Sequence, residues 1–113
     1  MTVIWHNPRC SKSRKTLALL DGRENIEVRL YLTDAPTPAE IEDAQRSLGV
    51  AAIAMMRTGE KLFRELGLTK SDDEADLRAA MADHPILIER PIVFHAGRAA
   101  IGRPPEAVLA LFD

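Results

Sequence analysis

The sequence predicts a mixed α/β fold, in which a strand–helix–strand unit and a later strand–strand–helix unit flank a helical insertion. Apolar runs with strand character lie near both ends of the chain, and the first is followed directly by a segment of helical periodicity. From Thr37 to Asp83 only helical signals occur. At 113 residues, 46% hydrophobic and 28% charged, the chain can bury one core but not two. We therefore expect a single domain over residues 1–113, with the insertion at about residues 37–83.

The first unit begins with a buried strand over Thr2 to Trp5 and continues with a helix over Ser11 to Asp21, which Gly22 ends. The predicted apolar face of this helix includes Leu17, Leu19 and Leu20. A second, half-buried strand is indicated by the alternation of Val28, Leu30 and Leu32 with Arg29 and Tyr31. The length of the run is that of a right-handed crossover, so the two strands should be parallel.

The insertion opens with a helix start at Thr37 and Pro38, where Glu40 completes the first turn. Its first helix has Ile41, Ala44 and Leu48 as apolar positions. Further helical segments are predicted over Ala51 to Met56, Lys61 to Leu66 and Glu74 to Ala82.

The last unit contains two short strands, Pro91 to His95 and Arg98 to Gly102, on either side of a hairpin turn at Ala96-Gly97. A final helix is predicted over Pro104 to Phe112. This order of elements is that of a thioredoxin-like fold with a helical insertion between the second and third strands.

Cys10 is the only cysteine, and it falls where the first strand passes into the first helix, in the segment HNPRCSKSRKT. A helix start offers free backbone N–H groups and a positive dipole end, which favour thiolate over thiol. Arg9, Lys12, Arg14 and Lys15 add cationic side chains. The pattern predicts a nucleophile with a lowered pKa, and the alternative is a small, buried apolar residue.

Ser13 stands where a C-x-x-C pair would have its second cysteine, so the chain is a monothiol variant of the thioredoxin-like pattern. No second sulfur of this chain can resolve an adduct on Cys10, and turnover therefore requires an external thiol such as glutathione. The C-x5-R loop of cysteine phosphatases is excluded by spacing, because the sixth residue after Cys10 is Thr16 and Arg14 comes too early.

Three arginines have settings unlike those of a solvent-facing helix stripe. Arg57 follows the apolar run AIAMM, Arg90 precedes Pro91, and Arg103 precedes two prolines at the start of the last helix. A guanidinium donates two parallel hydrogen bonds and stays charged, which suits a tetrahedral oxyanion. Their positions in the sequence do not by themselves decide whether these arginines bind an oxyanion or are ordinary surface residues.

Composition narrows the class of protein. A formal charge of -2 and a pI near 5.9 argue against broad nucleic-acid binding. One cysteine excludes an intrachain disulfide, and with three scattered histidines it gives no zinc pattern. No secretory leader opens the chain and no apolar stretch approaches the ~20 residues that span a bilayer, so we expect a cytoplasmic protein that needs no membrane.

Four separated segments carry a family resemblance: HNPRCSKSR, the apolar run that ends at Arg57, HPILIERPIV and IGRPPE. In order and spacing they resemble the arsenate reductase family that is coupled to glutaredoxin and glutathione, and the similarity covers nearly the whole chain. The end at Asp113 resembles the short branch of that family, because many arsenate reductases carry a further C-terminal extension.

The resemblance implies a role for each matching residue. Cys10 would be the nucleophile, Arg57, Arg90 and Arg103 would bind the oxyanion and stabilise its adduct, and Pro91 would follow a cis peptide bond beside the cysteine. His6 and Ser13 are supporting candidates: a protonated His6 would raise the thiolate population, or the ring would orient the loop, and the Ser13 hydroxyl would donate to the sulfur. His84 and His95 are treated as structural.

The implied reaction is the reduction of arsenate to arsenite through a thiolate–arsenic adduct, resolved by glutathione as co-substrate and by glutaredoxin as partner protein. No metal or bound cofactor is required. Two alternatives stay open at this point. One is a glutathione-dependent thiol transferase, whose arginines would hold a glutathione carboxylate. The other is a regulatory adaptor of the same fold, which ranks last because Ser13 removes the C-x-x-C switch.

Overall fold

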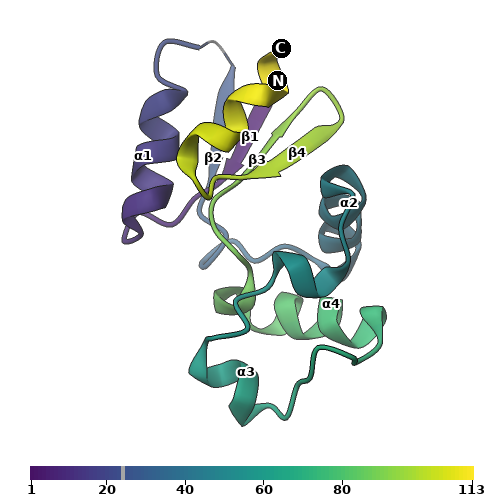
Figure 1. Ribbon diagram of the computed structural model, residues 1–113. Helices are drawn as coiled ribbons and strands as arrows, with labels where there is room; N and C mark the ends of the chain where they lie inside the picture. Colours follow the sequence, from purple (N-terminus) through teal and green to yellow (C-terminus); the bar gives the residue numbers. More distant parts are fainter. Residues whose placement is uncertain (24) are drawn as a thin grey trace. The chain divides into compact units, whose positions relative to one another are not determined.

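The computed structural model describes residues 1–23 and 25–113, which form two compact units (Figure 1). The first unit joins the two ends of the chain, Met1–Asp34 and Arg90–Asp113, and the second is Ala35–Glu89. The second unit contains the helical insertion expected from the sequence, with its boundaries a few residues further out.

The first unit contains a mixed sheet with the strand order β2-β1-β3-β4. Its strands are β1 (Thr2–Trp5), β2 (Ile26–Arg29), β3 (Ile92–His95) and β4 (Arg98–Ile101). β1 pairs parallel with β2 and antiparallel with β3, which pairs antiparallel with β4. The predicted parallel crossover is confirmed, and so is the hairpin, where Ala96 and Gly97 both have positive φ (52° and 79°).

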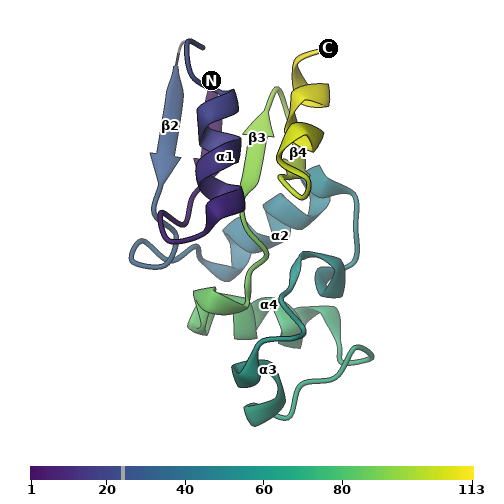
Figure 2. The ribbon, with the colours of Figure 1, turned by 60° about the vertical axis from the view of Figure 1, so that its left-hand side comes forward.

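Helix α1 (Ser11–Leu19) and the C-terminal η3 (Pro105–Phe112) cover one face of the sheet (Figure 2). The core beneath them is a cluster of buried apolar side chains: Ile4, Leu20, Val93, Val108 and Leu111. Leu17 packs against this cluster, whereas Leu19 is 37% exposed, so the prediction that Leu19 belongs to the apolar face is wrong. The reason is helical geometry, because Leu19 points away from the face that Leu20 shares with the core.

The second strand corrects the sequence prediction in both position and facing. It ends at Arg29, and the chain turns at once, with the N–H groups of Thr33 and Asp34 donating to the Leu30 carbonyl. Val28, Leu30 and Leu32 are 44%, 44% and 40% exposed, and Tyr31 is buried instead. Alternation gives a period of two but does not say which set faces the core, and here the aromatic residue takes the buried side.

The second unit is helical, as predicted. It contains α2 (Pro38–Leu48), η1 (Ala52–Met55), α3 (Lys61–Glu65), α4 (Glu74–Asp83) and η2 (Pro85–Leu87). The predicted helix start is a complete capping box, in which the Thr37 hydroxyl accepts from the Glu40 N–H and the Glu40 carboxylate accepts from the Thr37 N–H. At the other end, Gly49 closes α2 in the left-handed conformation at φ 70°.

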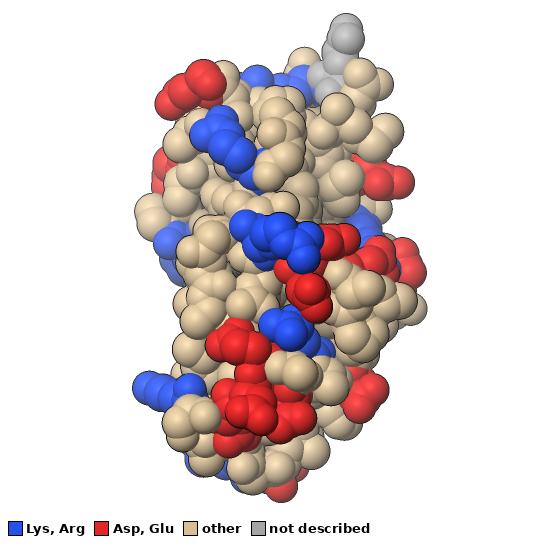
Figure 3. Space-filling model, turned by 90° about the vertical axis from the view of Figure 1, so that its right-hand side faces the viewer, with Lys and Arg blue, Asp and Glu red and all other residues tan. Residues whose placement is uncertain are grey.

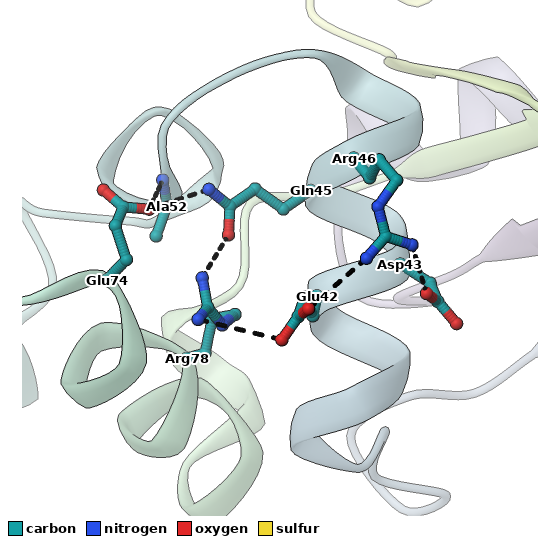
Figure 4. Close-up of polar contacts among 7 residues, drawn as sticks. All are labelled: Glu42, Asp43, Gln45, Arg46, Ala52, Glu74 and Arg78. Carbon is teal, nitrogen blue, oxygen red and sulfur yellow. Dashed lines mark hydrogen bonds and ion pairs between the residues drawn. The ribbon is translucent and has the colours of Figure 1, made fainter.

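A polar network joins three elements of this unit (Figure 4). Glu74 Oε2 accepts from the Ala52 backbone N–H at 2.8 Å and from Gln45 Nε2 at 2.7 Å, so one carboxylate links α4 to η1 and α2. Gln45 Oε1 in turn accepts from Arg78 at 3.0 Å. The face drawn in Figure 3 carries both acidic and basic side chains. On α2, Arg46 forms ion pairs with Glu42 and Asp43.

Two segments predicted as ordinary helices are 3-10 helices, η1 and η3. Each begins next to a residue in extended conformation, Ala51 and Pro104, and each is short and apolar. A short apolar sequence is compatible with both the α-helix and the 3-10 helix, so tertiary packing decides which of the two forms.

Candidate active site

The register of the sheet brings three distant segments to one end of it. Trp5, the last residue of β1, pairs with Ile92, the first of β3, and Ile92 pairs with Ile101, the last of β4. Beyond this row the chain leads from β1 to Cys10, from Arg90 into β3, and from β4 to Arg103. The sheet therefore collects the cysteine and two of the three predicted arginines at the same end.

Gly102 lets these segments approach one another closely. Its N–H donates to the Pro91 carbonyl at 2.9 Å. A Cβ on Gly102 would lie 2.5 Å from Thr16 Oγ1 and 2.8 Å from Pro91 Cγ, distances that side-chain carbons do not reach. Glycine at this position therefore allows the end of β4 to pack against α1 and Pro91. The Arg90–Pro91 bond is cis, as the resemblance implies, and the Arg103–Pro104 bond is cis as well.

Cys10 is the N-cap residue of α1, which begins at Ser11 as predicted. Partial burial raises the pKa of the thiol, but this effect is outweighed by the Ser13 N–H, the Arg90 charge, the Lys12 N–H and the Arg103 charge, which together lower the pKa below its ordinary value. The Cys10 side chain makes no capping hydrogen bond. The N–H groups of Lys12 and Ser13 stabilise the sulfur as it becomes a thiolate, at the positions where the side-chain oxygen of another N-cap residue would accept a hydrogen bond.

His6 and Ser13 form a buried pair beneath the loop that carries Cys10. His6 Nδ1 lies 2.7 Å from Ser13 Oγ, and Ser13 Oγ also accepts from the Asn7 N–H at 3.0 Å. Among the described residues these are the partners of the Ser13 hydroxyl, so the expected hydrogen bond from that hydroxyl to the sulfur is not formed. Ser13 acts on the sulfur through its backbone N–H instead.

The protonation state of His6 decides between the two roles predicted for it. Burial, followed by the positive charge of Arg14, lowers the pKa of His6 below its ordinary value of 6.5. The ring is therefore neutral at pH 7, and it does not stabilise the thiolate as a cation. Its geometry fits the other role, in which it holds Ser13 and the Asn7 backbone in place.

Two arginines are fixed close to the cysteine. Arg103 Nη1 donates to the Arg90 carbonyl at 3.3 Å, so the two residues hold each other at the same end of the sheet. Their charges act on the Cys10 sulfur, and that of Arg90 acts more strongly. Arg14 has a structural contact that the sequence did not indicate, because its Nη1 donates to the Pro8 carbonyl at 2.8 Å and braces the loop.

Arg57 belongs to the second unit, where both its backbone and its side chain have hydrogen-bond or ion-pair partners. An isolated antiparallel bridge between Met56 and Ile88 precedes it, and its N–H donates to the Leu87 carbonyl at 2.8 Å. Its guanidinium pairs with Glu60 at 3.1 Å, and each side chain of the pair is 24% exposed. Glu60 is a neighbour that the sequence reasoning missed, although its spacing of three residues is the available signal.

Among the residues that the structure describes, no three or more His, Cys, Asp or Glu side chains gather in a way that could hold a metal ion. None of the described helices has the length and apolar character required to cross a membrane.

The mixed sheet, the cis-proline before β3 and the lone cysteine before α1 define a thioredoxin-like protein with one sulfur at the first strand–helix junction. The profile of the ArsC family matches residues 5–111. A protein of Neisseria meningitidis serogroup A named arsenate reductase is 50% identical over 112 residues, which cover 96% of this chain and 95% of that one. An arsenate reductase of Haemophilus influenzae is 43% identical over 113 residues, with 96% and 97% covered.

Structural comparison agrees with the sequence comparison. The solved structure of an arsenate reductase from Vibrio cholerae has a TM-score of 0.93 at 48% identity, and the match covers 97% of this chain and 96% of that one. The chain belongs to the ArsC family. The predicted family and the predicted thioredoxin-like fold are confirmed.

Proposed function

We propose that the protein reduces arsenate to arsenite, with Cys10 as the nucleophile and with glutathione and glutaredoxin as the source of electrons. The observation that carries the proposal is the convergence of Cys10, Arg90 and Arg103 at one end of the sheet, where both arginine charges act on the sulfur. Cations that favour a thiolate also attract an anionic substrate to it. The names of the relatives supply the identity of that substrate.

The first step is attack of the Cys10 thiolate on arsenic, with loss of one oxygen as water. Arg90 and Arg103 offset the repulsion between the two anions and bind the oxygens of the adduct. The family resemblance adds Arg57 as a third ligand of the oxyanion. Lys12 and Ser13 N–H groups stabilise the sulfur as a thiolate before attack and when it leaves.

The remaining steps need thiols from outside the chain, because Cys10 is the only cysteine. Glutathione replaces a further oxygen of the arsenic, which leaves as water. A second thiol then attacks the glutathione sulfur, the arsenic–glutathione bond breaks, and its electron pair stays on arsenic, so that the two external thiols end as a disulfide. Water finally replaces the Cys10 sulfur on the reduced arsenic, which releases arsenite and the Cys10 thiolate. We propose that glutathione is a co-substrate, that no cofactor is bound, and that the reaction takes place in the reducing cytoplasm.

The test is a coupled assay in which the purified protein, glutathione, glutaredoxin and glutathione reductase consume NADPH when arsenate is added. We expect consumption with the wild type and none with Cys10→Ser. The charge-conserving Lys12→Arg variant, at an exposed position, is the matched control and should retain activity. No arsenate-dependent consumption by the wild type would refute the proposal, and consumption with a glutathione mixed disulfide but not with arsenate would favour the thiol transferase.

A further inference from the structure

One buried hydroxyl in α1 has no part in the chemistry described above. Thr16 lies in the middle of this helix and is fully buried. Its Oγ1 donates to the Lys12 carbonyl at 2.8 Å, one turn back along the helix. A threonine hydroxyl that bonds back in this way slightly destabilises a helix, and a valine of the same shape would fill a buried place without a polar group. The hydroxyl therefore needs a reason other than the stability of the helix.

The carbonyl that accepts this bond belongs to the amide that faces the sulfur. The Lys12 carbonyl and the Ser13 N–H are the two ends of one planar peptide unit. Ser13 is the third residue of α1, so its N–H has no carbonyl partner within the helix and is available to the N-cap residue, Cys10. Partial burial raises the pKa of the Cys10 thiol, and of the groups that lower it this N–H has the largest effect. Thr16, the amide and the sulfur thus form a chain of two hydrogen bonds.

Hydrogen bonds in such a chain strengthen one another. A donor at the carbonyl oxygen draws electron density from the nitrogen, so the N–H at the other end of the amide becomes a stronger donor. The effect is larger where water does not compete, and both Thr16 and Ser13 are fully buried. The Ser13 hydroxyl is engaged with His6 and Asn7, so the polarised N–H is the part of Ser13 that acts on the sulfur.

The surroundings of Thr16 hold its hydroxyl in this direction. In a helix, threonine divides between two rotamers, because its Oγ1 can bond a carbonyl of the preceding turn. A Cβ on Gly102 would lie 2.5 Å from Thr16 Oγ1, so the hydroxyl lies directly against the Gly102 backbone. The bond to the Lys12 carbonyl and the contact with Gly102 together select one rotamer.

We propose that Thr16 is a positioning residue for Cys10, whose hydroxyl polarises the amide between Lys12 and Ser13 so that the N–H of this amide holds the sulfur as a thiolate. The inference deepens the proposed function, because it rests on Cys10 as the nucleophile. The charges that act on Cys10 come from Arg90, before β3, and Arg103, after β4. The Thr16 hydroxyl adds to their effect without a charge of its own.

The test measures the pH dependence of Cys10 alkylation by iodoacetamide, which needs no arsenate. Thr16→Val removes the hydroxyl and keeps the shape of the side chain. We expect it to raise the alkylation midpoint by roughly 0.3–1 pH unit, the shift that corresponds to about 10–30% of one hydrogen bond in an apolar medium. Below the midpoint the alkylation rate should fall by about two- to tenfold. Thr16→Ser keeps the hydroxyl and should restore the wild-type midpoint.

A displaced arginine would also shift the midpoint, and two backgrounds separate this cause from the proposed one. In Arg90→Gln and in Arg103→Gln, a shift that acts through the amide persists, whereas a shift that acts through a displaced charge disappears when that charge is absent. The Ser13 amide proton gives an independent readout. Its NMR resonance should move upfield in Thr16→Val, because the N–H becomes a weaker donor.

Thr33→Val is the matched control, because the Thr33 hydroxyl also donates to a backbone carbonyl, that of Leu30, at 3.2 Å in an exposed turn. It should leave the midpoint unchanged. If Thr16→Val does not fold, Thr16→Ala removes the same hydroxyl with the same expectation. An unchanged midpoint, an equal shift in Thr16→Ser, or loss of the shift in either arginine background would overturn the proposal. Absence of arsenate turnover in the coupled assay would instead count against the proposed function and leave this result standing.

Discussion

The side chains of His6 and Ser13 share a buried hydrogen bond of 2.7 Å beneath the loop that carries Cys10. Ser13 is fully buried, and its hydroxyl also accepts from the Asn7 N–H. The Ser13 hydroxyl thus contacts both His6, directly after β1, and Asn7, the next residue of the loop. The pair fixes the path by which the chain passes from β1 to the N-cap of α1.

Removal of this hydroxyl should destabilise the protein. Ser13→Ala leaves the Asn7 N–H and His6 Nδ1 without their partner in a buried place, and each such loss costs about 1–3 kcal/mol. We expect the free energy of unfolding, measured with urea, to fall by that order. Ser71→Ala, at an exposed position, should change it by less than about 0.5 kcal/mol, and equal effects of the two variants would contradict the assignment.

Acidification should destabilise the protein through His6. Its folded pKa lies below 6.5, so between the two values the unfolded chain binds more protons than the folded one. The contribution is fully present above about pH 6.5 and is lost as the pH falls through that value towards the folded pKa. Unfolding of the wild type should therefore become easier by up to about 1.4 kcal/mol per pH unit in that window, and His6→Asn should reduce this slope. An NMR titration midpoint of His6 above 6.5 would disprove the prediction.

The thiol of Cys10 should titrate below its ordinary value of 9.0, as measured by the pH dependence of iodoacetamide alkylation. Arg90→Gln should raise the midpoint, and Arg103→Gln should raise it by less, because the Arg90 charge has the larger effect. Arg98→Gln is a control in the same unit, since Arg98 donates to the Leu111 carbonyl at 2.8 Å and is not among the groups that act on Cys10. The reverse order of the two arginines would show that their placement is wrong.

Gly102→Ala should cost about 1–3 kcal/mol of stability, because its methyl group would overlap with Thr16 and Pro91. Gly59 offers the matched control: a Cβ there meets nothing within 4 Å, so Gly59→Ala should be neutral or slightly stabilising. The nearest obstacle is Thr16 Oγ1, and the cost of Gly102→Ala should therefore shrink when it is introduced into a Thr16→Ala background. Additive losses in the double variant would exclude this contact as the cause.

Glu74 should stabilise the helical unit through its two acceptor contacts, with the Ala52 N–H and Gln45. We expect Glu74→Ala to reduce the free energy of unfolding by about 1–2 kcal/mol, while Glu74→Gln keeps an acceptor oxygen and loses less. Asp76→Ala, also in the first turn of α4, is the comparison for the loss of a helix-start charge alone. An equal effect of Asp76→Ala would mean that the charge, and not the network, provides the stability.

The sequence predicted the elements of this fold better than their facing. The strand before Cys10, the start of the first helix at Ser11, the helix start at Thr37 and the hairpin at Ala96-Gly97 were all predicted correctly, because each depends on local chemistry. The facing of Val28 was not, since it depends on how β2 pairs with β1. That of Leu30 and Leu32 was not either, because both lie in the turn that follows β2.

The same distinction holds for the site. Cys10 and the three arginines stood out by their local settings, and the resemblance implied what the arginines bind. The meeting of Cys10, Arg90 and Arg103 at one end of the sheet follows from the row of Trp5, Ile92 and Ile101, which pairs residues that are far apart in the chain. The contacts of His6 with Ser13 and of Arg57 with Glu60 are side-chain geometry and had no sequence signal strong enough to assign them.

Cys10, Arg90 and Arg103 all lie beyond the row formed by Trp5, Ile92 and Ile101, the last paired residues at that end of the sheet. The residues that pair in the sheet and the three residues gathered at its end are therefore different parts of the sequence. The side chains of Arg90 and Arg103 can therefore be replaced without the loss of any paired residue of the sheet. Gly102 and Ser13, in the same end region, do not have this freedom, because close packing fixes one and buried hydrogen bonds fix the other.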